Sequence, residues 1–169
     1  IKNSMGLVIP YNMFHGKLSF DNKFYDRHSN KEISSFLSYL KKIDKENSLD
    51  MNLAEFDFDL KQGMYFDSNI PAGYGVGSSG ALTAAVFLKY YKNKINYNDC
   101  SKLKEILGTL EAHFHGSSSG FDPLLSLVNT PLIFNEDKSI SKVNLILDQS
   151  GPGAIFILDT GKSRRTEPL

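Results

Sequence analysis

One stretch constrains this chain more than any other. Residues 70–81 read Ile-Pro-Ala-Gly-Tyr-Gly-Val-Gly-Ser-Ser-Gly-Ala, with glycine at three alternate positions, then two serines and further small residues. Glycine adopts positive φ and has no Cβ, so the backbone N–H groups of such a loop can turn inward. Ser78 and Ser79 stand where a helix should begin, and a helix N-terminus offers unpaired N–H donors and the positive end of its dipole. The stretch therefore predicts an anion site, most naturally for phosphate, where a serine hydroxyl can also bind Mg²⁺.

The two standard phosphate-binding loops do not fit this stretch. It lacks the lysine of the P-loop, and a Rossmann turn does not normally end in paired serines. It resembles instead the P-x-x-x-G-[LV]-G-S-S-[AG]-A motif of the GHMP kinases, which include galactokinase, homoserine kinase, mevalonate kinase and phosphomevalonate kinase. The positions that match are Pro71, Gly75, Val76, Gly77, Ser78, Ser79, Gly80 and Ala81. The resemblance implies that this loop, Gly73 included, binds the phosphates of ATP.

Composition limits the kinds of partner and the cellular compartment expected for this chain. Its 169 residues are enough for one domain with a core, and 19 basic residues balance 19 acidic ones. We therefore expect no nucleic-acid or anionic-membrane partner. No apolar run is long enough to span a bilayer, and no signal peptide is visible. The single Cys100 cannot form an internal disulfide and reads as an inert thiol, which suits a cytoplasmic protein.

The hydrophobic pattern predicts a mixture of helices and strands. A capping box at Ser29 and Glu32 precedes a helix over about 30–43, a second helix follows the glycine loop to about 90–92, and a third spans about 101–114. Strands are predicted over residues 6–10, 16–20, 56–60, 64–70, 131–134, 143–147 and 153–160, the second pairing with the first as a hairpin. On the strand at 56–60, Asp57 and Asp59 would share one face. They could bind a metal there, but solvent-facing charge is the commoner explanation.

Polar residues cluster at the end of the third helix. Glu111 borders the apolar stripe, and periodicity leaves open whether its carboxylate is buried beside a partner or exposed at the margin. Asp122 precedes Pro123, which favours an N-cap at Asp122 with Pro123 as the first helical residue. His113 and His115 do not share a helix face, so packing or hydrogen bonding is expected of them rather than a metal site.

This region carries a second resemblance. His115-Gly116-x-x-Ser119-Gly120-x-Asp122 is similar to the H-G-x-P-S-G-x-D motif of mevalonate kinases, with Ser118 replacing the proline and no functional group of the motif affected. The resemblance implies that Asp122 is the catalytic base and that Glu111, eleven positions earlier, holds Mg²⁺ together with Ser79. His115, Gly116, Ser119 and Gly120 would lie near the substrate.

A third segment supports this resemblance. Residues 159–166 are similar to the D-T-x-x-x-R-x-T segment of mevalonate kinases, which implies that Arg164 and Thr166 also lie near the substrate. Without the resemblance, Lys162, Arg164 and Arg165 would read as a small basic surface cluster.

Together the resemblances run from Gly6 to Thr166 and imply an α+β fold. This is the fold of the GHMP kinase N-terminal, ATP-binding domain, related to the second domain of ribosomal protein S5, with a mixed sheet packed against helices. We expect residues 1–169 to form this one domain, cut at both ends. Family members also carry an upstream lysine and G-E-[HY] segment and a C-terminal domain with a glycine-rich loop. Activity is therefore expected of the whole protein rather than of this piece.

The expected function is ATP-dependent phosphorylation of a small-molecule hydroxyl, most specifically of mevalonate to 5-phosphomevalonate, with ATP and Mg²⁺ bound. Catalysis of this kind rests on positioning and electrostatics. One alternative is another GHMP kinase acting on phosphomevalonate, homoserine or a sugar. Others are a non-catalytic nucleotide-binding relative and a structural domain whose glycine loop is only a turn. The presence of both Glu111 and Asp122 favours an enzyme, and the sequence leaves a homodimer open.

Overall fold

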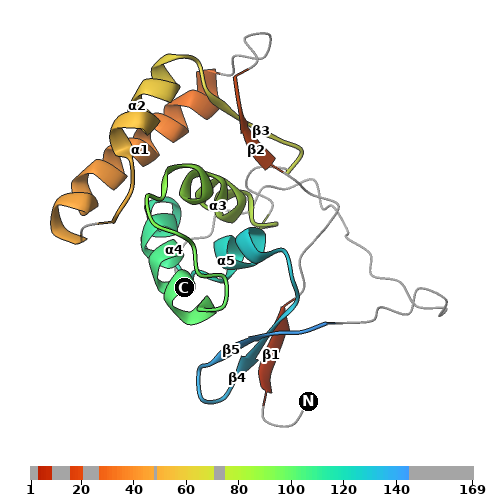
Figure 1. The fold of residues 1–169 in the computed structure, drawn as a ribbon. Helices are drawn as coiled ribbons and strands as arrows, with labels where there is room; N and C mark the ends of the chain where they lie inside the picture. Colours follow the sequence, from red (N-terminus) through yellow and green to blue (C-terminus); the bar gives the residue numbers. More distant parts are fainter. Residues whose placement is uncertain (1–3, 9–15, 21–26, 48, 71–74, 145–169) are drawn as a thin grey trace.

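The computed structural model describes residues 4–8, 16–20, 27–47, 49–70 and 75–144 (Figure 1). In chain order the elements are β1 (Ser4–Val8), β2 (Gly16–Ser19), α1 (Arg27–Asn47), α2 (Leu53–Lys61), β3 (Tyr65–Ser68), α3 (Ser78–Tyr90), α4 (Cys100–His115), α5 (Phe121–Val128), β4 (Leu132–Asn135) and β5 (Ile140–Lys142).

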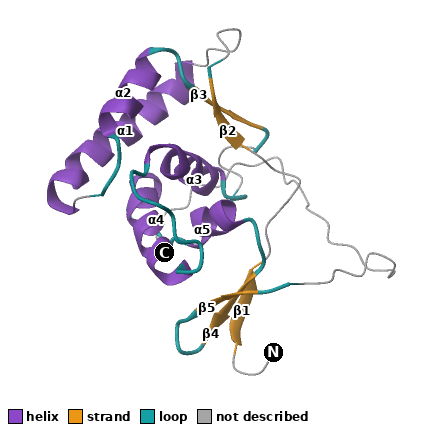
Figure 2. Ribbon diagram, viewed as in Figure 1, coloured by secondary structure: helices purple, strands orange, loops and turns teal. Residues whose placement is uncertain are grey.

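Helices and small sheets occupy separate parts of the fold. The described strands form two antiparallel sheets, one ordered β1-β4-β5 and the other β2-β3. In Figure 2 the three-stranded sheet lies beside α5 at one end, and the two-stranded sheet lies near α1 and α2 at the other. Helices α3, α4 and α5 pack together between them. This arrangement confirms the predicted α+β class.

The core is built from the apolar stripes of the helices. The predicted stripe of α1 is buried at Ile33, Phe36 and Leu40, and that of α4 at Leu107 and Leu110. All five belong to one continuous apolar cluster that also includes residues of α3 and α5. Because these faces meet in one core, the helices that carry both glycine-rich motifs are held rigidly against one another.

Residues 56–60 form part of helix α2, so the strand predicted there was wrong. Asn52 caps the helix, since its Oδ1 accepts from the backbone N–H of Glu55 at 3.3 Å while its Nδ2 donates to the Glu55 carboxylate at 2.6 Å. Phe56 is fully buried and stacks on Tyr90 with ring centroids 4.7 Å apart. The local alternation of Phe and Asp suggested period 2, but the cap and this tertiary contact favour a helix.

Strand pairing also differs from the prediction. β2 pairs with β3, and β1 pairs with β4, so the hairpin expected between the first two strands was wrong. Both pairings join segments distant in sequence, which local patterns do not reveal. Helix α1 begins at Arg27, so Ser29 is not its N-cap. Strand β5 (Ile140–Lys142) lies before the strand predicted over 143–147, and residues 143 and 144 are not in a strand.

Some predictions fall outside the described residues, namely the strand over 153–160 and the ends of the strands at 6–10 and 143–147. Among the helices that the structure describes, none has the length and apolar character needed to cross a bilayer.

Candidate active site

The predicted anion loop leads directly into helix α3. Gly75 and Gly77 both have positive φ, at 72° and 79°, the left-handed region that glycine enters without strain. Gly77 is the N-cap, and it forms no side-chain cap hydrogen bond to the first turn. Val76 and Ser78 lie in the same described segment, which therefore presents uncapped N–H donors at a helix N-terminus. Pro71 and Gly73, also predicted to bind phosphate, lie outside the described residues.

Helix α5 packs closely against the start of α3. A Cβ added to Gly80 would lie 2.8 Å from the carbonyl carbon and the Cβ of Asp122, and 2.9 Å from the nitrogen of Pro123. Only glycine permits this approach, because real Cβ contacts are almost never so short. A Cβ on Gly77 would lie 3.9 Å from Oδ2 of Asp122. The carboxylate predicted to be catalytic therefore lies beside the loop predicted to hold phosphate.

Asp122 is the second residue of α5 rather than its N-cap, so that prediction was wrong. The N-cap is Gly120, whose φ of 76° turns the chain, and the N–H of Leu124 already donates to its carbonyl at 3.2 Å. Asp122 thus stands in the first turn, where the helix dipole favours a negative charge. The turn is tight, since a Cβ on Gly120 would collide with the carbonyl oxygen of Lys104 on α4.

Glu111 is the buried carboxylate of the site, with only 3% of its surface exposed. Oε1 accepts a hydrogen bond from the hydroxyl of Ser79 at 3.0 Å, and Oε2 accepts one from the hydroxyl of Ser118. The ion pairs that the described residues form all lie elsewhere. Of the two alternatives left open by periodicity, the buried carboxylate is the one observed, and its partners are hydroxyls.

Burial raises the pKa of Glu111 above its usual value. The hydrogen bonds from Ser118 and Ser79 and the neighbouring His115 act to lower it, whereas the charge of Asp122 raises it further. Burial outweighs the opposing contributions because removing an ionised carboxylate from water is costly. A cation bound beside Glu111 and Asp122 would remove this penalty.

Ser79, on α3, contacts two residues of α4. Its Oγ lies 3.0 Å from Glu111 Oε1 and 3.0 Å from Nε2 of His115, the last residue of α4. His113, two residues earlier, instead stacks on Phe36 at 5.5 Å between ring centroids. The two histidines therefore serve hydrogen bonding and packing, as the sequence predicted.

The donor set at Ser79 and Glu111 fits Mg²⁺. Both offer oxygen, the ligand type that this ion prefers, and Mg²⁺ is usually held by one or two carboxylates together with substrate phosphates. No group of three or more His, Cys, Asp or Glu side chains able to hold a metal occurs within the described ranges.

Ser118 is the residue that sequence reasoning missed. The motif predicts a neutral replacement of proline at this position, but the Ser118 hydroxyl donates to Glu111 and accepts from the N–H of Gly120 at 2.9 Å. The sequence signal for this contact was the position of the Ser118 hydroxyl, seven residues after Glu111 at the margin of the apolar stripe. Spacing alone could not show that the loop folds back onto α4.

The remaining predicted residues shape or border the same turn. Gly116 ends α4 with φ of 74°, and the hydroxyl of Ser119 accepts from the N–H of Phe121 at 3.4 Å. Their predicted proximity to a substrate stays a prediction. Arg164 and Thr166 lie outside the described residues.

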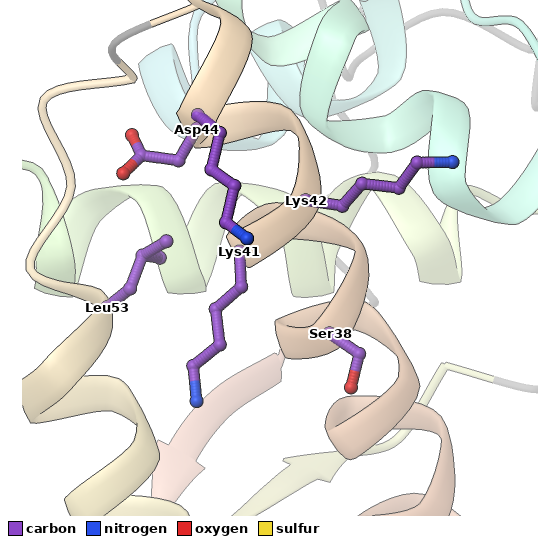
Figure 3. Close-up of a pocket in the computed structure, with 6 residues that line it drawn as sticks. Ser38, Lys41, Lys42, Asp44 and Leu53 are labelled. Carbon is purple, nitrogen blue, oxygen red and sulfur yellow. The ribbon is translucent and has the colours of Figure 1, made fainter.

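A separate hollow lies over α1 and the start of α2. It is lined by Ser38, Lys41, Lys42, Asp44, Lys45 and Leu53 (Figure 3). Lys41 is already paired with Asp57 at 3.2 Å, and Asp44 accepts from the N–H of Leu49 at 2.8 Å. None of the residues predicted for the phosphate site lines this hollow, and we assign it no part in that site.

Comparison with known proteins adds one finding. A family model described as the GHMP kinases N terminal domain matches residues 36–129, more than half of the chain. The matched part contains both glycine-rich motifs and, with them, Ser79, Glu111 and Asp122. No curated protein and no solved structure matches the chain.

Proposed function

We propose that this chain, which belongs to the GHMP kinases, binds ATP and takes part in transferring its γ-phosphoryl group to a small-molecule hydroxyl, with mevalonate as the favoured acceptor. The observation that carries the proposal is the pairing of Ser79 with the buried Glu111 at 3.0 Å, next to the uncapped start of α3. A cation would stabilise the charged form of this buried carboxylate, and a helix N-terminus favours an anion. Mg²⁺ with a nucleotide phosphate supplies both.

The N-terminus of α3 would hold the phosphates. The segment from Gly75 to Ser78 brings backbone N–H groups to the helix end, and the N-cap, Gly77, forms no side-chain cap hydrogen bond there. Hydrogen bonds from fixed backbone donors lose little entropy when the phosphate arrives, because the two positive-φ glycines already set the turn. Pro71, Gly73 and Gly80 complete the proposed phosphate loop.

Ser79 and Glu111 would hold Mg²⁺. When bound, the ion neutralises charge on the β- and γ-phosphates. The protein's own contribution is to keep the Glu111 carboxylate in place through hydroxyl partners on both of its oxygens. Because that carboxylate is almost fully excluded from water, its attraction for a cation is strong.

Asp122 would act on the acceptor hydroxyl. Its position in the first turn of α5, beside Gly77 and Gly80, places a carboxylate next to the proposed phosphate loop. It would accept the hydroxyl proton or orient the hydroxyl while the acceptor oxygen attacks the γ-phosphorus and ADP leaves. His115, Gly116, Ser119 and Gly120, with Arg164 and Thr166, would contact the acceptor. Their match to the mevalonate-kinase pattern is what favours mevalonate.

The test is a coupled assay of ADP release by the full-length protein. Mevalonate, phosphomevalonate, homoserine and galactose would be compared as acceptors, alongside an Asp122→Ala variant. We expect mevalonate-dependent ADP release and a loss of about 100-fold or more in kcat for the variant. Asp137→Ala is the matched control, because Asp137 is an exposed turn carboxylate hydrogen-bonded to Ser139 and should leave the rate unchanged.

The outcomes separate the alternatives. Turnover of another acceptor would keep the kinase chemistry and replace the substrate. Nucleotide binding without turnover of any acceptor would indicate a non-catalytic relative. Absence of nucleotide binding would overturn the proposal and leave the glycine loop as a structural turn.

A further inference from the structure

The hydroxyl of Ser118 joins two parts of the site that the sequence motif does not connect. It donates its only proton to Oε2 of Glu111, and its oxygen accepts from the N–H of Gly120 at 2.9 Å. Glu111 lies on α4, whereas Gly120 is the N-cap of α5, two residues before Asp122. One side chain therefore links the proposed metal-binding carboxylate to the turn that places the proposed base.

The two oxygens of Glu111 have different partners. Oε2 is held by Ser118, and Oε1 is hydrogen-bonded to Ser79 at the start of α3. A hydrogen bond on Oε2 fixes the rotation of the carboxylate and leaves Oε1 on the side of Ser79. A proline at position 118, as in the motif, has no side-chain donor and could not do this. The orientation of Glu111 in this chain thus depends on a residue that the motif does not supply.

The surroundings leave few other means of holding the carboxylate. Glu111 is 3% exposed, so water cannot readily replace a lost donor. None of the ion pairs among the described residues includes it. Gly108, one turn earlier on α4, would bring a Cβ within 3.2 Å of the carbonyl oxygen of Ser118, which shows how closely the loop is fitted to the helix. Ser118 is therefore both a donor to Glu111 and a fixed point of the loop.

We propose that Ser118 is a positioning residue of the divalent-cation site, which orients Glu111 for Mg²⁺ and couples that orientation to the turn carrying Asp122. The inference rests on the proposed function of Glu111 and Ser79. Partners behind a metal ligand commonly contribute 10- to 100-fold to metal affinity, although they never touch the ion. Loss of the hydroxyl should therefore weaken metal binding about 10- to 100-fold while nucleotide affinity without metal stays near that of the wild type.

The test is a titration of the full-length protein with Mn²⁺ in saturating ADP, followed through the electron paramagnetic resonance signal of free Mn²⁺. Ser118→Ala should raise the Mn²⁺ dissociation constant about 10- to 100-fold, and Ser118→Thr, which keeps the hydroxyl, should restore it to within about threefold. Ser118→Pro, the residue of the motif, should bind as weakly as the alanine variant. Ser139→Ala is the matched control, since it removes another serine-to-carboxylate hydrogen bond, at the exposed Asp137. Circular dichroism checks that each variant folds, and Ser118→Cys, which keeps the volume but donates weakly, replaces any alanine variant that does not.

The results distinguish failure of the proposed function from failure of the positioning role of Ser118. Wild-type protein that binds neither ADP nor Mn²⁺ would overturn the proposed function and this inference with it. Wild-type binding with unchanged Mn²⁺ affinity in Ser118→Ala, or with full affinity in Ser118→Pro, would overturn the positioning role alone. Weak binding in the alanine and proline variants, with recovery in the threonine variant, would establish it.

Discussion

Carboxylates in two regions of this molecule are held in opposite ways. On α2, Asp57 pairs with Lys41 at 3.2 Å and Lys61 at 2.6 Å, and Asp59 pairs with Lys89 at 2.8 Å. On α4, Glu111 is more deeply buried, and the hydrogen bonds that it receives within the described part of the chain come from serine hydroxyls, at the start of α3 and in the loop before α5. Among the described residues, lysines neutralise the carboxylates of α2, whereas no lysine or arginine pairs with Glu111 on α4.

The directions of the pKa shifts follow from this difference. Hydrogen bonds from Lys61 and Lys41 lower the pKa of Asp57. Burial alone would raise the pKa of Asp59, but its bonds from Lys89 and Tyr90 outweigh this effect and lower it. Burial raises the pKa of Glu111. Lysines therefore satisfy the carboxylates of α2, whereas Glu111 has no such partner among the residues that the structure describes. A perturbed pKa of this kind is common at functional sites.

The largest expected effect comes from neutralising Glu111. Glu111→Gln should lower mevalonate-dependent ADP release at least about 100-fold, because the proposed site loses its charged metal ligand. In metal-free buffer at pH 7 the same variant should melt about 2–4 °C higher, the scale of about 1 kcal/mol in a domain of this size, since a buried charge is removed. Steady-state kinetics and calorimetry measure the two effects.

Asp59→Asn is the matched control for this experiment. It should retain activity and lose stability, the reverse of the result at Glu111. A Glu111→Gln variant that stays active, or one that melts lower without metal, would contradict the distinction between the two regions.

The next effect concerns the contact that brings α3 and α5 together. Gly80→Ala should destabilise the protein by about 1–3 kcal/mol, because its Cβ would stand 2.8 Å from backbone and Cβ atoms of Asp122 that cannot move alone. Chemical denaturation measures the loss. Activity should fall as well, since the displaced element carries the proposed base. Ala81→Gly, at the next position of the same helix, controls for helix propensity. Equal stability of Gly80→Ala and the wild type would show that α3 and α5 are not in close contact.

The fold was predictable where local chemistry decides it. The stripe of Ile33, Phe36 and Leu40 fixed α1, and the glycine loop followed by small residues placed the start of α3 correctly. The α+β class followed from the mixture of patterns. At 56–60 the alternation of Phe and Asp gave the wrong prediction of a strand. The buried contact between Phe56 and Tyr90 that favours the helix joins residues far apart in the sequence, so a local pattern does not reveal it.

The candidate site was predictable in its residue types but not in its connections. Motif spacing selected Ser79, Glu111 and Asp122, and the structure brings all three to the region where α3, α4 and α5 meet. The role of Ser118 was not predictable, since it requires the loop to fold back over Glu111. Pairing of β1 with β4 was missed for the same reason, because both depend on contacts between distant parts of the chain.

A smaller effect is expected at Asp59, and its pH dependence tests the direction of the pKa shift. At pH 7, Asp59→Asn should lower the melting temperature by about 2–4 °C, because the ion pair with Lys89 is lost while Tyr90 keeps an acceptor. The folded pKa of Asp59 lies below its ordinary value of 3.8, so its stabilisation is full above that value and is lost as the pH falls through the folded pKa. The gap between wild type and variant should therefore close below about pH 3.8. A gap that widens in acid would reverse the assigned direction.

The smallest effect is expected at Asp57. It compares the exposed ion pairs of Asp57 with the less exposed ion pair of Asp59 on the same helix. Its two lysine partners, Lys41 and Lys61, have side chains that are 47% and 71% exposed, so water and salt screen both pairs. Exposed pairs of this kind often contribute nothing measurable. Asp57→Asn should therefore shift the melting temperature by no more than about 1 °C, and added salt at 0.5 M should remove even that, whereas the effect at Asp59 should largely persist. Thermal melts of both variants at low and high salt make the comparison. Equal salt sensitivity of the two would mean that burial does not distinguish them, and that the contrast with Glu111 rests on the absence of a lysine partner alone.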